Sequence, residues 1–255
     1  MVKYALLIGI NYKNSKSELF GCVNDVKAMK ALLIHKYKYK EENITMLHDE
    51  SYNYFDLPTR DNILLSLSAY VSIANEEDEL WIHYSGHGSF VKDKNKDECD
   101  KRDEVIVPCD YARKGYIMDD DLFSLLRFSR SVVQITFDCC HSGTSLDLPF
   151  LYRTRTKKRK LHDKPIHNSK IYMLSACRDK QKALDLSYGV GSAMGAFTSS
   201  LVYMLSLHKQ MRLHTLKNKI NNYMKNRNYK QRCVLTSSDE EAFKRIITPK
   251  GIIIR

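Results

Sequence analysis

The chain has 255 residues, and its 41 Lys and Arg against 30 Asp and Glu give a formal net charge of +11 at pH 7. A hydrophobic content of 43% and an aromatic content of 10% exclude global disorder, because disordered chains lack this much apolar side chain. A membrane-spanning helix is excluded as well, since no run of about 18 uncharged apolar residues occurs.

Strand and helix patterns alternate along the chain. Residues 4–10 form a continuous apolar run that is too short for a signal peptide and typical of a strand buried on both faces. Further strands are predicted at 44–48, 79–84, 132–137, 170–176 and 232–236. Helical spacing predicts helices over 22–36, 59–73, 119–128, 193–207 and 212–226. This alternation predicts an α/β fold with a mostly parallel sheet and helices on both faces.

Positive charge is concentrated in two segments. Residues 1–150 carry 18 basic and 24 acidic side chains, whereas 151–170 carry eight basic and one acidic, and 207–232 carry eight basic and none acidic. Apolar residues at helical spacing within 207–232 favour a solvated helix face over a nucleic-acid surface. The polar, basic stretch over 151–169 holds a proline and predicts a solvated, mobile linker between residues 1–150 and 170–255.

Seven cysteines stand at positions 22, 99, 109, 139, 140, 177 and 233, without a C-x-x-C pair. An odd count without paired spacing argues against a disulfide framework and a structural zinc site. Free cysteines are typical of a reducing compartment, so we expect a cytoplasmic protein. The basic run at 157–160 leaves a nuclear location open.

Two unusual stretches follow predicted strands, namely 85–88 (Ser-Gly-His-Gly) and 138–143 (Asp-Cys-Cys-His-Ser-Gly). Because parallel strands end at one edge of the sheet, we expect both stretches there. A cysteine nucleophile needs a base or cation to raise its thiolate fraction, and backbone N–H groups near glycine can stabilise an oxyanion. A lone Cys or His is more often a packing residue, but two such motifs at matching strand ends favour a nucleophile with its base.

These two blocks closely resemble those of the metacaspases, which are caspase-fold cysteine peptidases. The resemblance runs from about Tyr4 to Ser237 and includes further blocks at 21–25, 108–111, 119–122, 175–179 and 195–198. It implies a single caspase-like domain, in which 1–150 are similar to a large subunit and 170–255 to a small one. It implies that His87 is the general base and acid and Cys140 the nucleophile, with the Gly88 and Cys140 N–H groups as the oxyanion hole.

The resemblance also implies cleavage after Arg or Lys. A pocket for these side chains needs carboxylates to pair with the cation. Asp25 and Asp138 match the family's acidic pocket, and Cys22 and Ser85 match its lining, whereas the alternative for Asp25 is a residue on a helix surface. Many members require calcium, whose preferred ligands are carboxylate oxygens. The matching ligand positions are Asp103, Asp119, Asp120 and Asp147, with a solvated acidic surface as the alternative.

The basic stretch at 151–169 gains a second interpretation as a self-cleavage segment, because an enzyme that cuts after Arg or Lys could cut itself there. An exposed basic loop or a localisation patch remains the alternative. We therefore expect a calcium-dependent cysteine endopeptidase that acts on protein substrates after Arg or Lys. We expect a monomer of minimal form without a prodomain, and neither a membrane nor a nucleic acid as partner. The alternative function is a caspase-fold scaffold or binding protein with weak or no proteolysis.

Overall fold

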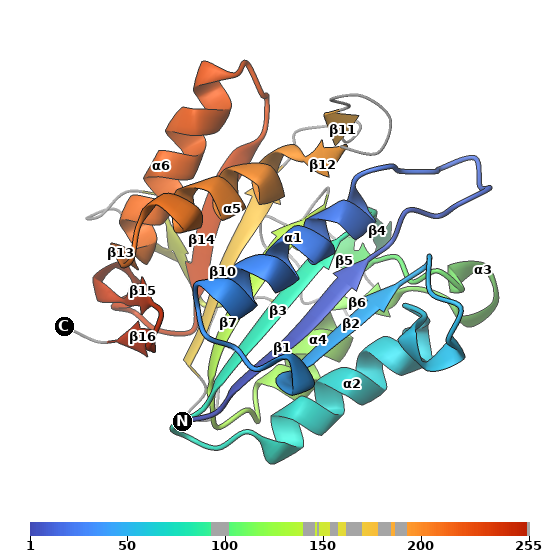
Figure 1. The fold of residues 1–255 in the computed structure, drawn as a ribbon, viewed down its shortest axis with the longest axis horizontal. Helices are drawn as coiled ribbons and strands as arrows, with labels where there is room; N and C mark the ends of the chain where they lie inside the picture. The colour runs from blue at the N-terminus through green and yellow to red at the C-terminus, as the bar shows by residue number, and fades with distance from the viewer. Residues whose placement is uncertain are drawn as a thin grey trace.

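The computed structural model describes residues 1–92, 102–139, 146, 148–153, 158–161, 170–177, 185–186 and 193–253. Within these residues, eight strands form the central sheet: β1 (Lys3–Gly9), β2 (Ile44–His48), β3 (Glu79–Ser85), β7 (Val132–Asp138), β8 (Phe150–Tyr152), β9 (Lys158–Lys160), β10 (Lys170–Cys177) and β14 (Arg232–Ser237). Their order across the sheet is β2–β1–β3–β7–β10–β14–β8–β9 (Figure 1). In this order, the strands from β2 to β10 are parallel to one another. Strands β14, β8 and β9 each pair antiparallel with the strand before them.

Helices cover both faces of this sheet, as the sequence predicted (Figure 1). The first face packs against α1 (Cys22–His35), α5 (Ala196–Leu207) and α6 (Leu213–Asn226), and the second against α2 (Arg60–Ile73) and α4 (Asp119–Leu126). Side chains of β3 alternate between the two cores: Trp81 lies under α1, while Leu80 and Ile82 lie in the core on the other face. This alternation explains why every residue of β3 is buried, since a strand covered on both faces has no solvated side.

The remaining elements were not predicted, and most of them have too few residues for a periodic pattern. They comprise β4 (Gly88–Lys92), β5 (Arg102–Ile106), α3 (Tyr111–Lys114), β6 (Ile117–Met118), β11 (Asp185–Leu186), β12 (Met194–Gly195), β13 (Met211–Arg212), β15 (Ile246–Thr248), β16 (Gly251–Ile253) and three single 3₁₀ turns (Glu41–Asn43, Tyr54–Asp56, Ala242–Lys244). Helix α5 begins three residues later than predicted, because Met194 and Gly195 form β12. Among the described residues, no helix is long and apolar enough to cross a membrane.

The expected linker over 151–169 needs correction, because part of it belongs to the sheet. Strand β8 pairs with β14, and β9 pairs with β8. Tyr152 is buried, and its hydroxyl donates to Asp239 O at 2.5 Å. Three-residue strands are too short to show alternation, so composition alone suggested a solvated segment. Residues 154–157 and 162–169 lie outside the described part of the chain.

Lys217 corrects the expectation that the charges of 207–232 all lie on a solvated face. Its ammonium group is buried and donates to the backbone oxygens of Tyr152 (3.0 Å) and Arg153 (2.7 Å). Burial lowers the pKa of this amine, because the charged form loses its hydration. The apolar residues of α6 are buried as the helical spacing predicted, so the helix is held to the sheet by both kinds of contact.

Candidate active site

The described residues of the two strand-end motifs lie at one edge of the sheet, as predicted. Strands β3 and β7 are parallel neighbours, and Ser85 lies opposite Asp138. The Gly86 N–H donates to Asp138 O at 3.4 Å. His87 follows, between the end of β3 and the start of β4 at Gly88. Cys140, the predicted nucleophile, lies outside the described residues, so the described part of the predicted dyad and oxyanion hole is His87 and Gly88.

His87 is held from four directions. Its N–H donates to Tyr12 Oη at 3.0 Å, and its carbonyl oxygen accepts from Tyr84 Oη at 2.6 Å. The Tyr12 ring lies against the imidazole, with 4.6 Å between ring centroids. The imidazole Nε2 lies 2.6 Å from Ser17 O. A carbonyl oxygen can only accept, so Nε2 carries the proton in the neutral ring and Nδ1 is left as the acceptor. In this tautomer the imidazole offers Nδ1 as a proton acceptor.

The two tyrosines that hold His87 were missed from the sequence. Burial raises the pKa of both phenols well above the usual value, so their hydroxyls stay protonated and can donate. Tyr12 Oη donates to Val107 O at 2.6 Å, which links the β1–α1 loop to the chain after β5. Tyr84 belongs to β3 itself. Nothing in the local pattern marks Tyr12, since a buried tyrosine is common in a core, whereas Tyr84 directly precedes the 85–88 stretch but was assigned no role.

The predicted pocket residues Asp25 and Asp138 converge beside α5. Asp25 lies in the first turn of α1 and is fully buried, so the alternative of a surface position is wrong. Its carboxylate accepts from Ser85 Oγ (2.6 Å) and from the Gly195 N–H (2.9 Å). Asp138 is also buried, and its Oδ2 accepts from both the N–H (2.9 Å) and the Oγ1 (2.8 Å) of Thr198. The start of α5 therefore binds both carboxylates.

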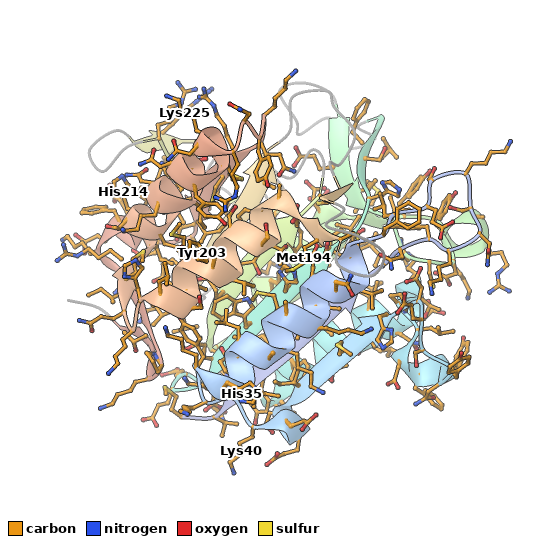
Figure 2. The ribbon with its side chains drawn as sticks, turned by 45° about the horizontal axis from the view of Figure 1, so that its top comes forward. His35, Lys40, Met194, Tyr203, His214 and Lys225 are labelled. Carbon is orange, nitrogen blue, oxygen red and sulfur yellow. The ribbon has the colours of Figure 1, made fainter. Side chains whose placement is uncertain are left out.

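Gly195 separates these carboxylates. A Cβ atom at this position would lie 2.1 Å from Asp138 Oδ2 and 2.8 Å from Asp25 Oδ2. Two buried carboxylates so close repel each other unless donors or a cation offset their charge. Met194, just before Gly195, lies between the N-terminal ends of α1 and α5 (Figure 2), and Asn24 Nδ2 donates to Ala193 O at 2.9 Å. The arrangement places two buried, hydrogen-bonded carboxyl groups at the edge that carries His87.

Cys22, predicted to line the pocket, is the first residue of α1 and is buried. Its N–H donates to Asn11 Oδ1 at 3.0 Å, one turn before Asp25. Gly195 and Thr198 belong to a block noted in the sequence, but the sequence alone assigned them no role. The available signal was a glycine near the start of the predicted helix over 193–207, followed three residues later by a threonine.

Of the four predicted calcium ligands, two have side chains that the structure describes. Asp119 and Asp120 begin α4, and Asp119 Oδ1 accepts from the Asp120 N–H at 3.0 Å. Strands β5 and β6 pair with Val105 opposite Met118, which brings the backbone of Asp103 toward the start of α4. The side chain of Asp103 and all of Asp147 lie outside the described part, in which no group of three or more His, Cys, Asp or Glu is arranged around a metal position. Carboxylate oxygens suit calcium chemically.

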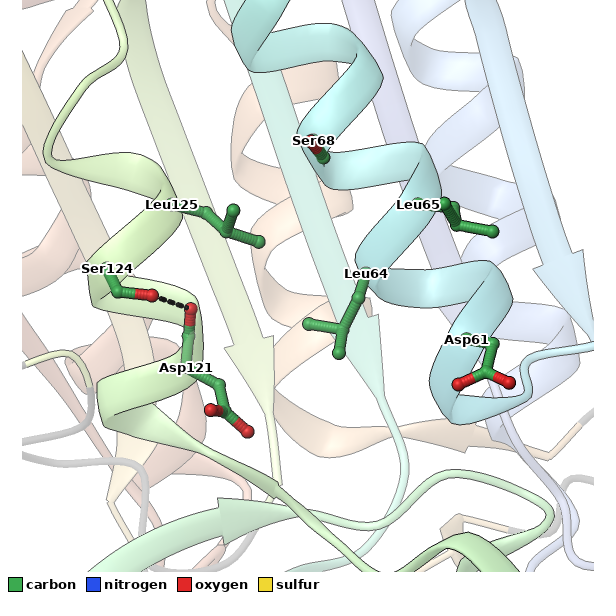
Figure 3. A pocket seen from close by; sticks show the side chains of 7 residues that line it. All are labelled: Asp61, Leu64, Leu65, Ser68, Asp121, Ser124 and Leu125. Atoms are coloured by element: carbon green, nitrogen blue, oxygen red, sulfur yellow. Dashed lines mark hydrogen bonds between the residues drawn. The ribbon is translucent and has the colours of Figure 1, made fainter.

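A separate hollow lies between α2 and α4, with a volume of about 550 Å³ (Figure 3). Its lining mixes leucines with serines and two aspartates: Asp61, Leu64, Leu65, Ser68, Asp121, Ser124 and Leu125. Both aspartates form ion pairs, Asp121 with Arg60 at 3.0 Å and Asp61 with Lys114 at 3.3 Å. Among the described residues, none of those predicted for catalysis or for the pocket lines this hollow, so it is distinct from the site around His87.

The model of the metacaspase, peptidase C14 domain matches residues 3–149. The chain is 44% identical to Metacaspase-1B of Neurospora crassa over 59% of this chain and 36% of that one. It is 40% identical to Metacaspase-1 of Schizosaccharomyces pombe over 76% of this chain and 44% of that one. The chain thus spans less than half the length of these curated relatives.

Two solved structures share the fold. Protein GSU0716 from Geobacter sulfurreducens aligns with a TM-score of 0.70 at 22% identity and covers 99% of this chain and 100% of its own. The structure of pro-sf-caspase-1 aligns with a TM-score of 0.55 at 12% identity and covers 93% and 87%. The caspase neighbour agrees with the mostly parallel sheet between helices. With the domain match over more than half of its length, this chain belongs to the metacaspase family of caspase-like cysteine peptidases.

Proposed function

We propose that the protein is a calcium-dependent cysteine endopeptidase that cleaves protein substrates after Arg or Lys. The observation that carries this proposal is the pair of buried carboxylates, Asp25 and Asp138, at the same sheet edge as His87. A desolvated guanidinium or ammonium group is stabilised by such a pair, whereas an aspartate side chain would be repelled. Ser85 belongs to this pocket through its hydrogen bond to Asp25, and Cys22 contributes to the lining.

The catalytic steps follow from the groups around His87. His87 takes the proton of the Cys140 thiol, and the thiolate sulfur forms a bond to the carbonyl carbon after the basic residue. The Gly88 and Cys140 N–H groups stabilise the resulting oxyanion. When the C–N bond breaks, the leaving amine takes the proton from His87. Water, deprotonated by His87, then attacks the thioester, and the released thiolate recovers the proton.

Ser17 and Tyr12 support these steps by fixing the imidazole. The Ser17 carbonyl stabilises the positive charge that His87 acquires when it accepts the second proton, because a carbonyl dipole lies against Nε2–H. The Tyr12 ring limits rotation of the imidazole about its side-chain bonds. Held in this way, the base meets the thiol without an additional ordering cost.

Calcium is proposed to be bound by Asp103, Asp119, Asp120 and Asp147. The donor set fits, since all four supply the hard oxygen ligands that calcium takes. A bound ion would offset the mutual repulsion of these carboxylates. Asp121 is not assigned to this set, because its carboxylate pairs with Arg60. Self-processing within 151–169 is part of the same proposal, at basic residues outside strands β8 and β9.

The experiment compares fluorogenic peptides that end in Arg, Lys or Asp, with calcium and with chelator. Calcium-dependent hydrolysis after Arg and Lys is expected from the wild type and lost in Cys140→Ala. Asp25→Asn and Asp138→Asn should raise KM for both peptides. Asp121→Asn removes a carboxylate that pairs with Arg60 and serves as the matched control. Cleavage after Asp would contradict the pocket, and no cleavage of any peptide would favour the scaffold function.

A further inference from the structure

Asp49 binds the loop that follows β1. It stands directly after β2, and its side chain is half-buried. Oδ1 accepts from the Asn11 N–H at 2.9 Å, and Oδ2 accepts from the Tyr12 N–H at 2.6 Å. Both carboxylate oxygens are therefore used by two consecutive backbone donors. Hydrogen bonds to a charged acceptor are the strong kind, so this contact can impose a backbone conformation.

Tyr12 has such an imposed conformation, with φ at +52°. A bulky L-residue disfavours this left-handed region, because its Cβ crowds the backbone. The conformation aims the tyrosine at His87: the Tyr12 ring lies against the imidazole, and Oη accepts the His87 N–H. Strain of this sort persists where surrounding contacts hold it, and Asp49 provides the contact here.

Asn11 connects the Asp49 carboxylate to the specificity pocket. Its Oδ1 accepts from the N–H groups of Cys22 (3.0 Å) and Val23 (3.4 Å), the first two residues of α1. The N-cap residue of α1 is Gly21, which has no side chain for this purpose. Asn11 therefore supplies the cap from a distant part of the chain. Because Asp25 lies in the first turn of α1, this cap sets the position of the pocket carboxylate.

Asn11 also closes the loop that reaches His87 Nε2. Its carbonyl oxygen accepts from the Leu19 N–H at 2.7 Å, which brings the two ends of the loop together. Ser17, whose carbonyl oxygen lies 2.6 Å from Nε2, is within that loop. Through Asn11 and Tyr12, the Asp49 carboxylate thus supports three contacts at the site. These are the packing of Tyr12 against His87, the Ser17 carbonyl at Nε2 and the capped start of α1.

We propose that Asp49 is a positioning residue that aligns the base and the specificity pocket together, through Tyr12 and through Asn11. This role rests on the proposed peptidase function. Asp49 does not touch the substrate; it acts by holding two neighbouring residues that control different parts of the site. Loss of Asp49 should therefore affect both kcat and KM, while changes at Tyr12 and Asn11 should separate the two effects.

The test measures kcat and KM on an Arg peptide for Asp49→Asn, Tyr12→Phe and Asn11→Ala. An amide has one oxygen, so Asp49→Asn turns an NH₂ group toward one of the two backbone donors. This variant is expected to lower kcat/KM by about 10- to 100-fold, as small misplacements of catalytic groups do. Tyr12→Phe should lower kcat with little change in KM, and Asn11→Ala should mainly raise KM.

Asp61→Asn is the matched control, since Asp61 pairs with Lys114 at the surface and should leave both constants unchanged. A wild type without activity would overturn the proposed peptidase function itself. An active wild type with an equally active Asp49→Asn would overturn the positioning role alone. If circular dichroism shows that Asp49→Asn does not fold, the other two variants test the proposal. Tyr12→Phe should then change mainly kcat and Asn11→Ala mainly KM, and equal effects of both variants on kcat and KM would overturn the proposal.

Discussion

Gly195→Ala is expected to disable the pocket without touching the catalytic dyad. The new Cβ would lie 2.1 Å from Asp138 Oδ2 and 2.8 Å from Asp25 Oδ2, distances that no real contact permits. At least one carboxylate must move away from the position in which it meets the substrate cation. Weakening one member of a buried, hydrogen-bonded charge pair costs about 2–5 kcal/mol. At about 1.4 kcal/mol per tenfold change, kcat/KM for an Arg peptide should fall by roughly 30-fold or more.

The assay separates pocket damage from general damage. Alkylation of the Cys140 thiol by a small neutral reagent needs the base but not the pocket, so its rate should stay unchanged in Gly195→Ala. Gly115→Ala is the matched control: nothing lies within 4 Å of its added Cβ, while its φ of +80° strains an L-residue. It should lower the melting temperature and leave kcat/KM unchanged. A folded Gly195→Ala with wild-type kcat/KM would refute the assignment of this carboxylate pair to the substrate cation.

Three further predictions concern residues that hold the site or the sheet. Thr198→Val removes the hydroxyl donor to Asp138 and should raise KM for Arg peptides about tenfold, as expected for a hydrogen bond to a charged group. Thr198→Ser keeps the hydroxyl and should restore the KM. Failure of this rescue would contradict the role of the Thr198 hydroxyl. Burial lowers the pKa of His83 to about 3, below the unfolded value of about 6.5. Its contribution to stability is therefore complete above pH 6.5 and is lost as the pH falls, by up to about 1.4 kcal/mol per pH unit. Urea unfolding at pH 7, 6 and 5 should show a smaller loss in His83→Leu, and parallel losses would argue against this. Lys217→Met removes the donor to the Arg153 carbonyl and should speed cleavage by trypsin after Arg153. The rates are compared by mass spectrometry in a Cys140→Ala background. Equal rates would show that the ammonium group does not protect this bond.

The strands and helices that carry the site could be predicted because their local patterns are strong. Strand β3 carries the apolar run from Leu80 to Ile82, and α1 places apolar residues at helical spacing, among them Val23, Val26 and Met29. Thr59, the first residue of the predicted helix over 59–73, caps α2 through its Oγ1, which accepts from the Asn62 N–H at 3.2 Å. Each of these signals lies within a few residues of the element it predicts, so no knowledge of distant contacts was needed.

The edge hairpin β8–β9 and the buried Lys217 could not be predicted in the same way. The basic residues of 151–170 and 207–232 suggested solvated segments, since an isolated ammonium group is costly to bury. In the folded chain, the carbonyl oxygens of Tyr152 and Arg153 compensate that cost. These partners are more than sixty residues away in sequence, so composition could not reveal them.

The sequence by itself determined the fold class and the strand ends at which chemistry is expected, including that of His87. Those conclusions depend on local periodicity and on residue types with distinct chemistry, whereas the pocket role of Asp25 and Asp138 was implied by the resemblance to the metacaspases. Only the tertiary structure decided that Gly195 stands between the two carboxylates, and that Asp49 holds Tyr12 against His87. The physical reason is that parallel strands bring together segments from distant parts of the chain. Contacts between their loops leave no repeating pattern in the sequence of either segment.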